Sequence, residues 1–311
     1  MNKIPQSIAK QQGAILIIAV FVVSVITVIA ARFAGDFQLS TARIKQSLIH
    51  TQLQQFAYSI ESFAGWVLVQ DAEFDKSHSR YNNDGVNGSY DHLQEDWAQH
   101  LQAPIESATV EATLSDAMSR FNINQLQGKP SPYKPQGTFS ERYTIAQQRF
   151  IRLLQTYPDD AIDVATAQQI TQAVIDWLDS DSNEQPNGGA EENYYASLEQ
   201  PYKPANRYFV SITELKQVKG ISADMYRYLS PLLIALPNKE GFNINTAPIE
   251  LMRTLQQKNI ETPLSDEDAN LLISSRPQDN THEAYQSVNG FLASSEANQI
   301  FGTDAQQWPK V

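Results

Sequence analysis

The sequence contains no cysteine among its 311 residues, and charged side chains make up only 19% of it. Without cysteine there can be no disulfide bond, Cys-ligated zinc, iron–sulfur cluster or Cys nucleophile. None of the five histidines stands in an HExxH pattern, and there is no GxSxG nucleophile motif and no glycine-rich phosphate loop. We therefore expect a protein that is not an enzyme.

Positive charge is also scarce. The 23 Lys and Arg residues face 35 Asp and Glu residues, which gives a formal net charge of −12. Lys3, Lys10 and Arg32 belong to the N-terminal region, so the rest of the chain is more acidic still. A body this acidic repels phosphate backbones, which disfavours nucleic-acid binding. The 41% of hydrophobic residues is enough for a buried core and excludes a wholly disordered chain.

One long apolar run is present near the N-terminus. Residues 14–31 carry no charge, and about 18 such residues reach the lower limit for a membrane-spanning helix. The alternatives are a cleaved secretory signal, a signal anchor with lysines on the cytoplasmic side, and a leader that is cut before the apolar run. The polar leader ends at Gly13 and the apolar run begins at Ala14, so the small residue precedes the apolar core. This order favours cleavage between Gly13 and Ala14, which leaves the helix on the mature protein.

The helical pattern continues beyond the apolar run. No proline occurs from Ala14 to Trp66, which predicts one helix of some 50 residues, about 75 Å long. Its N-terminal half is apolar and its C-terminal half is amphipathic. The apolar residues of the second half recur mostly at spacings of three, four or seven, at Phe37, Ile44, Leu48, Leu53, Phe56, Ile60, Phe63 and Val67.

The rest of the chain divides by composition. Residues 71–96 are polar and loop-like, 105–126 alternate as short strands do, and 127–140 are rich in turn residues. From Ser140 onwards the patterns are mainly helical, and the loop at 180–205 separates them. The helical segments are predicted within 143–157, 165–180, 207–237, 246–260 and 265–276, with Asp159 and Asp160 as candidate helix caps.

A weak internal repeat accompanies these helices. Phe121-Asn-Ile-Asn124 recurs as Phe242-Asn-Ile-Asn245, and Ser211-Ile-Thr-Glu-Leu215 has a counterpart in Ser287-Val-Asn-Gly-Phe291. The pattern predicts two related helical units, with chance similarity as the alternative.

The strongest candidate ligand cluster follows a predicted helix. Asp179, Asp181 and Asn183 occupy positions 1, 3 and 5 of a loop, as at the start of an EF-hand. Glu184 replaces the glycine of the sharp turn, and the closing acid, Glu191, comes one residue late. The residues alone leave two interpretations open: an EF-like calcium loop closed by Glu191, and a solvated turn. The predicted ligands are Asp179, Asp181, Asn183 and Glu191, with Asp176 and Glu192 in reserve.

Two further segments resemble known motifs. Residues 215–221 are similar to a helix-hairpin-helix turn, which presents main-chain N–H groups to phosphate in DNA-binding proteins. The acidic body favours a packing role for this turn instead. Residues 82–88 are rich in Asn, Asp and Gly and are predicted to form a turn rather than a second metal site.

Several segments, taken together, resemble the K-type minor pseudopilin family of the type II secretion system. They follow one another in the expected order along nearly the whole chain. They are the leader at Gly13 and Ala14 with Ile18 behind it, Asp91–Trp97, Ser115–Asn124, Asp176–Asp181, Gly189–Glu191, Phe209–Leu215 and Phe242–Ala247.

This resemblance implies an α+β fold: a long N-terminal helix packed on a small antiparallel sheet, with a large inserted all-helical domain. It implies cleavage by prepilin peptidase, an inner-membrane anchor, a periplasmic globular part and a structural calcium ion. It also implies the I- and J-type minor pseudopilins and the major pseudopilin as partners, with secreted cargo as a further contact. The implied function is a structural subunit at the pseudopilus tip, in protein export across the outer membrane.

Ile18 bears on the position in the filament. It is the fifth residue after the predicted cleavage point, where major pilins carry a glutamate that pairs with a neighbour's N-terminal ammonium. Ile18 cannot form this pair, which suits a subunit with none above it. The alternatives are a minor type IV pilin, which would more often keep that glutamate and a disulfide, and a membrane-anchored envelope enzyme.

The predicted boundaries assign each part of the chain a role. Members of the family usually continue past a segment like 290–311 with further strands, so we expect an incomplete or smaller sheet. The predicted parts are a leader (1–13), a membrane and filament segment (14–34), a pilin-like region (35–126), an inserted helical domain with the calcium loop (127–240) and a second helical unit with an incomplete pilin region (241–311).

Overall fold

The computed structural model divides the chain into two compact units, Met1–Val67 and Leu68–Val311. The residues that the structure describes are 8–79, 91–99, 101–105, 108–158, 162–237, 241–257, 259–276, 285 and 287–302. The predicted turn at 82–88 and the candidate caps Asp159 and Asp160 lie outside these residues.

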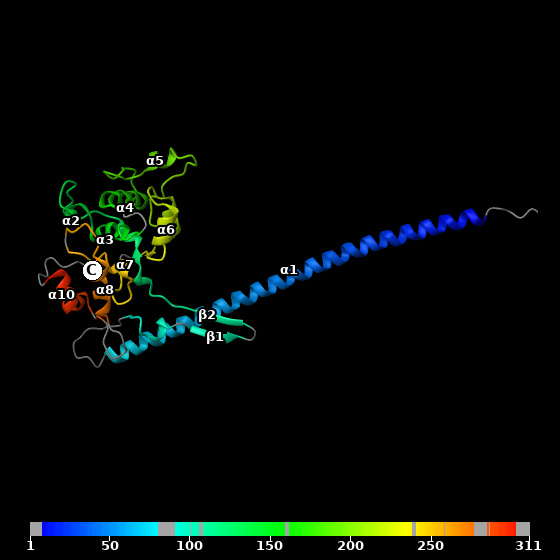
Figure 1. The fold of residues 1–311 in the computed structure, drawn as a ribbon, viewed down its shortest axis with the longest axis horizontal. Coiled ribbons are helices and arrows are strands. Elements are labelled where there is room, and N and C mark those ends of the chain that lie inside the picture. Colours follow the sequence, from blue (N-terminus) through cyan, green and yellow to red (C-terminus); the bar gives the residue numbers. More distant parts are fainter. Residues whose placement is uncertain are drawn as a thin grey trace, which may run out of the picture. The chain divides into compact units, whose positions relative to one another are not determined.

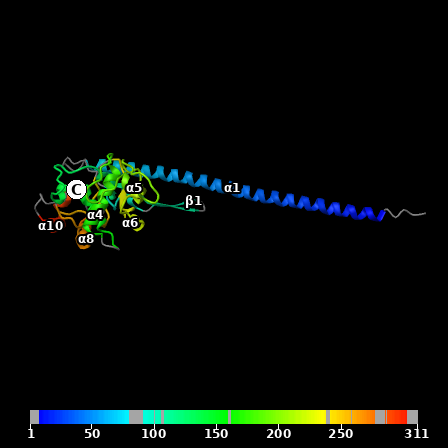
Figure 2. The same cartoon turned by 90° about the horizontal axis from the view of Figure 1, so that it is seen from above.

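Helix α1 (Ile8–Ser79) is one unbroken helix of 72 residues (Figures 1 and 2). The predicted continuous helix is confirmed, and it begins earlier and ends later than expected. Hydroxyl groups in its apolar half bond the preceding turn, as when Ser24 Oγ donates to Val20 O (2.8 Å) and Thr27 Oγ1 to Val23 O (2.8 Å). These bonds satisfy the polar groups within the helix, as an apolar environment requires. By length and composition the helix can cross a membrane, since an 18-residue window within Ala14–Phe74 has a mean hydropathy of 3.1.

The described residues of the Leu68–Val311 unit form two small sheets. β1 (Leu101–Ile105) and β2 (Ala108–Ala112) pair antiparallel, from Leu101 opposite Ala112 to Ile105 opposite Ala108. β3 (Phe121–Asn122) pairs parallel with β4 (Leu233–Ile234), more than a hundred residues later. Short 3₁₀ helices flank these strands: η1 (Asp96–Ala98), η2 (Ala117–Ser119) and η3 (Ile123–Leu126).

The helices between β3 and β4 have side-chain caps at most of their N-termini. Thr144 and Gln147 form a capping box at α3, and the α4 cap is Asp163, which accepts the N–H of Thr166 (2.7 Å). Helices α3 and α4 pack side by side (Figure 1). The elements are α2 (Phe139–Arg142), α3 (Ile145–Leu154), α4 (Val164–Leu178), α5 (Glu192–Ala196), the 3₁₀ helix η4 (Ile212–Gln217) and α6 (Ala223–Leu229).

In the described residues after β4 there are four more helices. Ser265, Ser287 and Ser294 cap three of them through their hydroxyl groups. Helices α8 and α10 are neighbours in both views (Figures 1 and 2). The four are α7 (Ile249–Met252), α8 (Asp266–Ser274), α9 (Val288–Leu292) and α10 (Ser295–Phe301).

A single hydrophobic core joins both sets of helices, from Phe121 to Phe301. Burial of each large apolar side chain contributes roughly 1.5–3 kcal/mol. Arg152, itself buried, links α3 to the segment after α7: its guanidinium donates to Thr254 O at 3.0 Å and to Ile260 O at 2.8 and 3.0 Å. The two sets of helices are therefore one packed body.

The first Phe-Asn-Ile-Asn segment forms a compact polar frame. Asn122 Oδ1 accepts the N–H of Asn124 (3.2 Å). The Asn124 amide then pairs with both main-chain groups of Phe209, accepting from N at 2.8 Å and donating to O at 3.0 Å. Ser211, two residues after Phe209, caps η4.

The second segment repeats this frame. Asn243 Oδ1 accepts the N–H of Asn245 (3.0 Å), and the Asn245 amide pairs with N and O of Tyr285 at 3.1 and 3.3 Å. Ser287, two residues after Tyr285, caps α9. The predicted repeat is confirmed, and we call residues 121–236 the first repeat unit and 242–302 the second.

Candidate metal centre

The predicted calcium loop connects α4 to α5. Asp179 ends α4 with extended backbone (ψ 166°), and Glu191 precedes the first residue of α5. The loop brings together three of the four predicted ligands. One carboxylate oxygen each from Asp179, Asp181 and Glu191 lies within 4.8 Å of the other two.

Glu191 is the most unusual of the three. Only 4% of its surface is exposed, and within the described part of the chain neither carboxylate oxygen has a hydrogen-bond partner. Burial, and then the charges of Asp176, Asp179 and Asp181, raise its pKa to about 7. Asp179 Oδ1 is also buried with no hydrogen-bond partner in the described ranges, and burial raises the Asp179 pKa. A bound cation would supply the missing partner for these anions, whose isolation is otherwise costly.

Asp176 has a different role from that of a reserve ligand. It is fully buried, and its Oδ2 accepts the N–H groups of Gln185 (3.2 Å) and Ala190 (2.7 Å). Its pKa is raised to about 6 by burial. A Cβ added to Gly189 would lie 2.2 Å from Asp176 Oδ2, so this close approach requires glycine. Asp176 therefore holds the main chain of the loop in place from its buried side.

The other two predicted residues lie at the edge of the loop. Asn183 is exposed, and its main-chain N–H and side-chain amide both donate to Asp181 Oδ1 (2.8 Å). These bonds lower the Asp181 pKa and keep that carboxylate ionised. The reserve residue Glu192 pairs instead with Lys203 (2.8 Å), and both side chains are largely exposed.

Two contributors to the site were missed by sequence reasoning. Asn206 Nδ2 donates to Asp181 O (3.0 Å), while Asn206 Oδ1 is buried without a hydrogen-bond partner among the described residues. Lys219 Nζ donates to Gly188 O (3.4 Å) and Gly189 O (2.9 Å). Asn206 and Lys219 both lie outside the loop sequence, so the ligand spacing could not reveal them. The unusual feature of Asn206 is its positive φ (46°), which is a property of the folded backbone and cannot be read from the sequence.

The donor set is suited to a hard divalent cation. It consists of carboxylates and nearby amide or carbonyl oxygens, and among the described residues the cluster includes no histidine. Calcium accepts 6–8 oxygen ligands at 2.3–2.6 Å, while softer metals prefer nitrogen and sulfur. The chemistry of the residues present therefore fits a calcium ion.

The hairpin at residues 215–221 packs on the core through Leu215 and Val218, both of which are buried. Gly220 has φ +87°, and Lys219 contributes to the metal loop as described. The ammonium of Lys216 lies over the ring of Tyr226, 4.4 Å from its centroid. These contacts engage the basic groups of the turn within the protein, which supports a packing role.

A helix of membrane-spanning length, followed along the chain by two repeated helical units and a loop that gathers three carboxylates, defines a membrane-anchored subunit with a pilin-like helix. A family model described as type II secretion system (T2SS), protein K, matches residues 119–238. The chain is 31% identical over 274 residues to type II secretion system protein K of Aeromonas hydrophila, covering 88% of this chain and 78% of the relative. It is 30% identical to the Pectobacterium carotovorum protein, covering 76% and 67%. The chain belongs to the type II secretion system protein K family.

A solved structure has the same fold. It is the GspK–GspI–GspJ complex from the enterotoxigenic Escherichia coli type 2 secretion system, matched with a TM-score of 0.53 and 24% identity over 79% of this chain and 80% of that chain. Membership of this family identifies the protein as a minor pseudopilin of type II secretion. It favours this assignment over the alternative of a minor type IV pilin.

Proposed function

We propose that this minor pseudopilin is the tip subunit of the pseudopilus and that its role is structural rather than catalytic. The observation that carries the proposal is Ile18, an apolar residue at the fifth position after the predicted cleavage point. A charged residue there is favourable only when a neighbouring charge pairs with it inside the apolar bundle. A subunit with no neighbour above it has no use for that charge.

We propose the corresponding membrane arrangement. The leader with Lys3 and Lys10 lies on the cytoplasmic side, α1 crosses the inner membrane, and the head lies in the periplasm. Prepilin peptidase cuts between Gly13 and Ala14, both within α1. The I- and J-type minor pseudopilins are the proposed direct partners, since the similar structure is a GspK–GspI–GspJ complex. The major pseudopilin and secreted cargo are proposed as further contacts.

We propose calcium as a structural cofactor held by Asp179, Asp181 and Glu191. Asn183 stays a predicted ligand, and Asn206 Oδ1 is an additional candidate donor. When bound, the cation neutralises the buried carboxylates and fixes the connection between α4 and α5. Asp176 and Lys219 hold the loop main chain in place. Extracellular calcium modules bind at roughly 10⁻⁴–10⁻³ M, a range suited to structural occupancy.

The tip assignment is tested first by N-terminal mass analysis of the chain, expressed with and without prepilin peptidase. We expect loss of residues 1–13 only with the peptidase, and no loss in Gly13→Val. Gly35→Val, a matched glycine further along α1, should be processed normally. An intact N-terminus would indicate a signal anchor, and cleavage after the apolar run would overturn the filament assignment.

A substitution of Ile18, at the fifth position after the predicted cleavage point, provides a second test of the tip assignment. Ile18→Glu should allow the subunit to cross-link to copies of itself within filaments, whereas the natural chain should not. If both chains cross-link to themselves equally, Ile18 does not specify the tip.

The calcium proposal is tested by thermal unfolding of the full chain in detergent. Calcium at 10 mM should raise the stability by about 1.4–2.7 kcal/mol for dissociation constants of 10⁻³–10⁻⁴ M. Terbium should bind in its place and give luminescence sensitised by Trp177, which precedes Asp179 by two residues. Glu191→Gln should abolish both effects, and Glu192→Gln should change neither. Equal responses in the two variants would contradict the assignment.

A further inference from the structure

The first repeat unit contains a strand that has no counterpart among the described residues of the second. β4 lies parallel to Phe121–Asn122, and Phe121 N donates to Leu232 O (2.9 Å). At the end of this pairing the Asn122 amide bonds Leu236, accepting from N at 3.1 Å and donating to O at 3.2 Å. The Phe-Asn-Ile-Asn frame of the first unit therefore supports an extended aliphatic segment.

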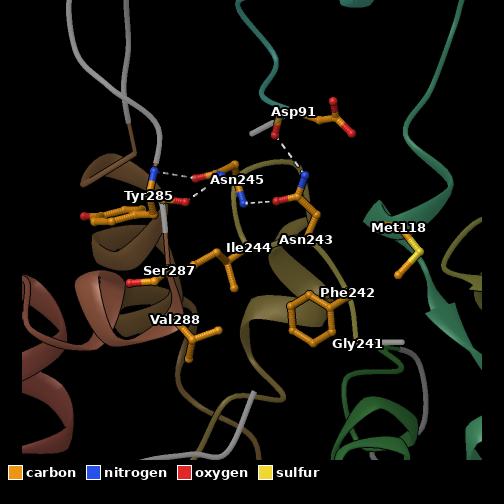
Figure 3. Close-up of a pocket in the computed structure, with 10 residues that line it drawn as sticks. All are labelled: Asp91, Met118, Gly241, Phe242, Asn243, Ile244, Asn245, Tyr285, Ser287 and Val288. Atoms are coloured by element: carbon orange, nitrogen blue, oxygen red, sulfur yellow. Dashed lines mark hydrogen bonds between the residues drawn. The ribbon is translucent and has the colours of Figure 1, made fainter. Parts of the chain in front are cut away.

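The matching place in the second unit is a cavity of about 410 Å³ (Figure 3). Among the described residues, nothing hydrogen-bonds to the main-chain N–H or C=O of Phe242, the counterpart of Phe121. The other edge of this segment is already used, since Asn243 N donates to Met118 O (2.8 Å). The apolar lining of the cavity consists of Met118, Phe242, Ile244 and Val288. We call this cavity the second-unit groove.

One end of the groove is closed and acidic. Asn243 Nδ2 donates to Asp91 O (2.8 Å), so the Asp91 carbonyl takes the place that Leu236 O has in the first unit (Figure 3). Asp91 is exposed, and its carboxylate lies within 4.8 Å of carboxylate oxygens of Asp71 and Glu95. Because β4 runs toward Leu236, a strand docked in the same direction would point its C-terminal end at these acids.

We propose that the second-unit groove binds an extended segment of a partner protein, parallel to Phe242–Asn243, with aliphatic side chains and a basic C-terminal end. The repeat provides the backbone geometry and the apolar requirement, and the acidic end provides the charge requirement. The contact is small, because β4 itself pairs over only two residues. We expect a dissociation constant on the order of 100 μM, since only a few side chains become buried.

The test uses the full chain in detergent and two labelled peptides, measured by fluorescence anisotropy. The first is Ser-Pro-Leu-Leu-Ile-Ala-Leu-Lys-Lys, which is this chain's own sequence from 230 to 236 with two added lysines. The second has the same composition with both lysines at the N-terminus. The first should bind about two- to fivefold more tightly at low salt, and the difference should shrink at high salt.

Three variants locate the binding. Val288→Asp places a charge in the groove and should weaken binding of the first peptide about tenfold or more. Val210→Asp, at a 77% exposed valine of the first unit, should leave it unchanged. Asp91→Asn should make the two peptides bind equally while keeping the carbonyl that bonds Asn243.

The outcomes are decisive in both directions. Binding that depends on Val288 and on peptide direction supports the proposal. Failure of the first peptide to bind, equal loss in Val288→Asp and Val210→Asp, or indifference to lysine position would overturn it. So would cross-links, from a photoreactive group placed at 288, to residues 303–311 of the same chain, because the groove would then be filled internally.

Discussion

The two repeat units use the same polar frame for different purposes. In both, one asparagine amide holds the following turn and a second pairs with both main-chain groups of a distant residue. Between these points the first unit inserts α3, α4 and the candidate metal loop, and its edge is covered by β4. The described part of the second unit has shorter helices and an open groove. The difference indicates that the asparagine frame is the structural constant, and that the connections around it determine what each unit binds.

The frame succeeds because an asparagine amide has the same donor and acceptor pair as a peptide group. It can therefore satisfy a neighbouring main chain where no regular strand is present. This explains how the two-residue pairing of β3 with β4 persists in a largely helical head.

The largest expected effect separates the two frames directly. Asn124 is 2% exposed, and its side chain bonds Phe209 N, Phe209 O and Leu236 O. Asn124→Ala leaves these buried groups unpaired and should lower the free energy of unfolding by about 3–4 kcal/mol. Among the described residues, Asn245→Ala breaks two bonds, at 3.1 and 3.3 Å, and should cost about 1–2 kcal/mol. Chemical denaturation measures both, and equal losses would show that the frames are energetically equivalent.

Two glycines provide the next comparison. Gly189→Ala forces a Cβ against Asp176 and Gln185 in the metal loop, and should destabilise the head by about 2–4 kcal/mol. In the second unit, a Cβ at Gly290 meets Ser287 Oγ at 3.3 Å, so Gly290→Ala should stay within about 0.5 kcal/mol. Thermal unfolding of both variants is the measurement. A harmless Gly189→Ala would contradict the close approach of Asp176.

The pH dependence should arise in the first unit. The pKa of Glu191 is raised to about 7 and that of Asp176 to about 6, so between pH 4.5 and 7 the folded state binds more protons than the unfolded state. Stability without metal should therefore fall from pH 5 to pH 8 by roughly 1–3 kcal/mol. Calcium should restore it, most strongly at pH 8, where both carboxylates are ionised.

Matched variants isolate this pH effect. Glu191→Gln should flatten most of the pH dependence. Asp266→Asn, which removes a largely exposed partner of Arg253 in the second unit, should leave it unchanged. A profile that is flat in the natural chain would contradict the burial of an unpaired Glu191.

The smallest effect concerns the hairpin of the first unit. Lys219→Met keeps the length of the side chain but removes its bonds to Gly188 O and Gly189 O. It should lower stability by about 0.5–1.5 kcal/mol and weaken calcium binding, because the loop main chain is less restrained. Lys203→Met, at an exposed ion pair, is the control and should change neither quantity measurably.

Local patterns predicted much of this architecture. The proline-free apolar and amphipathic run predicted α1, although the ends were placed too far inward. Helical spacing predicted α3, α4 and α8 within a few residues. The Phe-Asn-Ile-Asn repeat was visible as letters, but the pairing of Asn124 with Phe209 joins residues 85 positions apart, which spacing does not reveal.

The metal loop was predicted only in part for the same reason. Asp179, Asp181 and Glu191 follow a ligand spacing that can be read along the chain, and the fold does bring them together. Asp176 was expected to face the ion, but burial beneath the loop directs it to main-chain N–H groups. Asn206 approaches through a turn with positive φ that no loop motif includes.

The sequence by itself determined the membrane-length helix, the absence of cysteine chemistry, the acidic character and the ligand types of the loop, because these depend on composition and on neighbours within a few residues. Only the tertiary structure decided, among the described residues, which carboxylate is buried without a hydrogen-bond partner, which glycine cannot be replaced and which repeat unit has the groove. Those properties depend on contacts between residues far apart in the chain, and on the exclusion of water that packing alone produces.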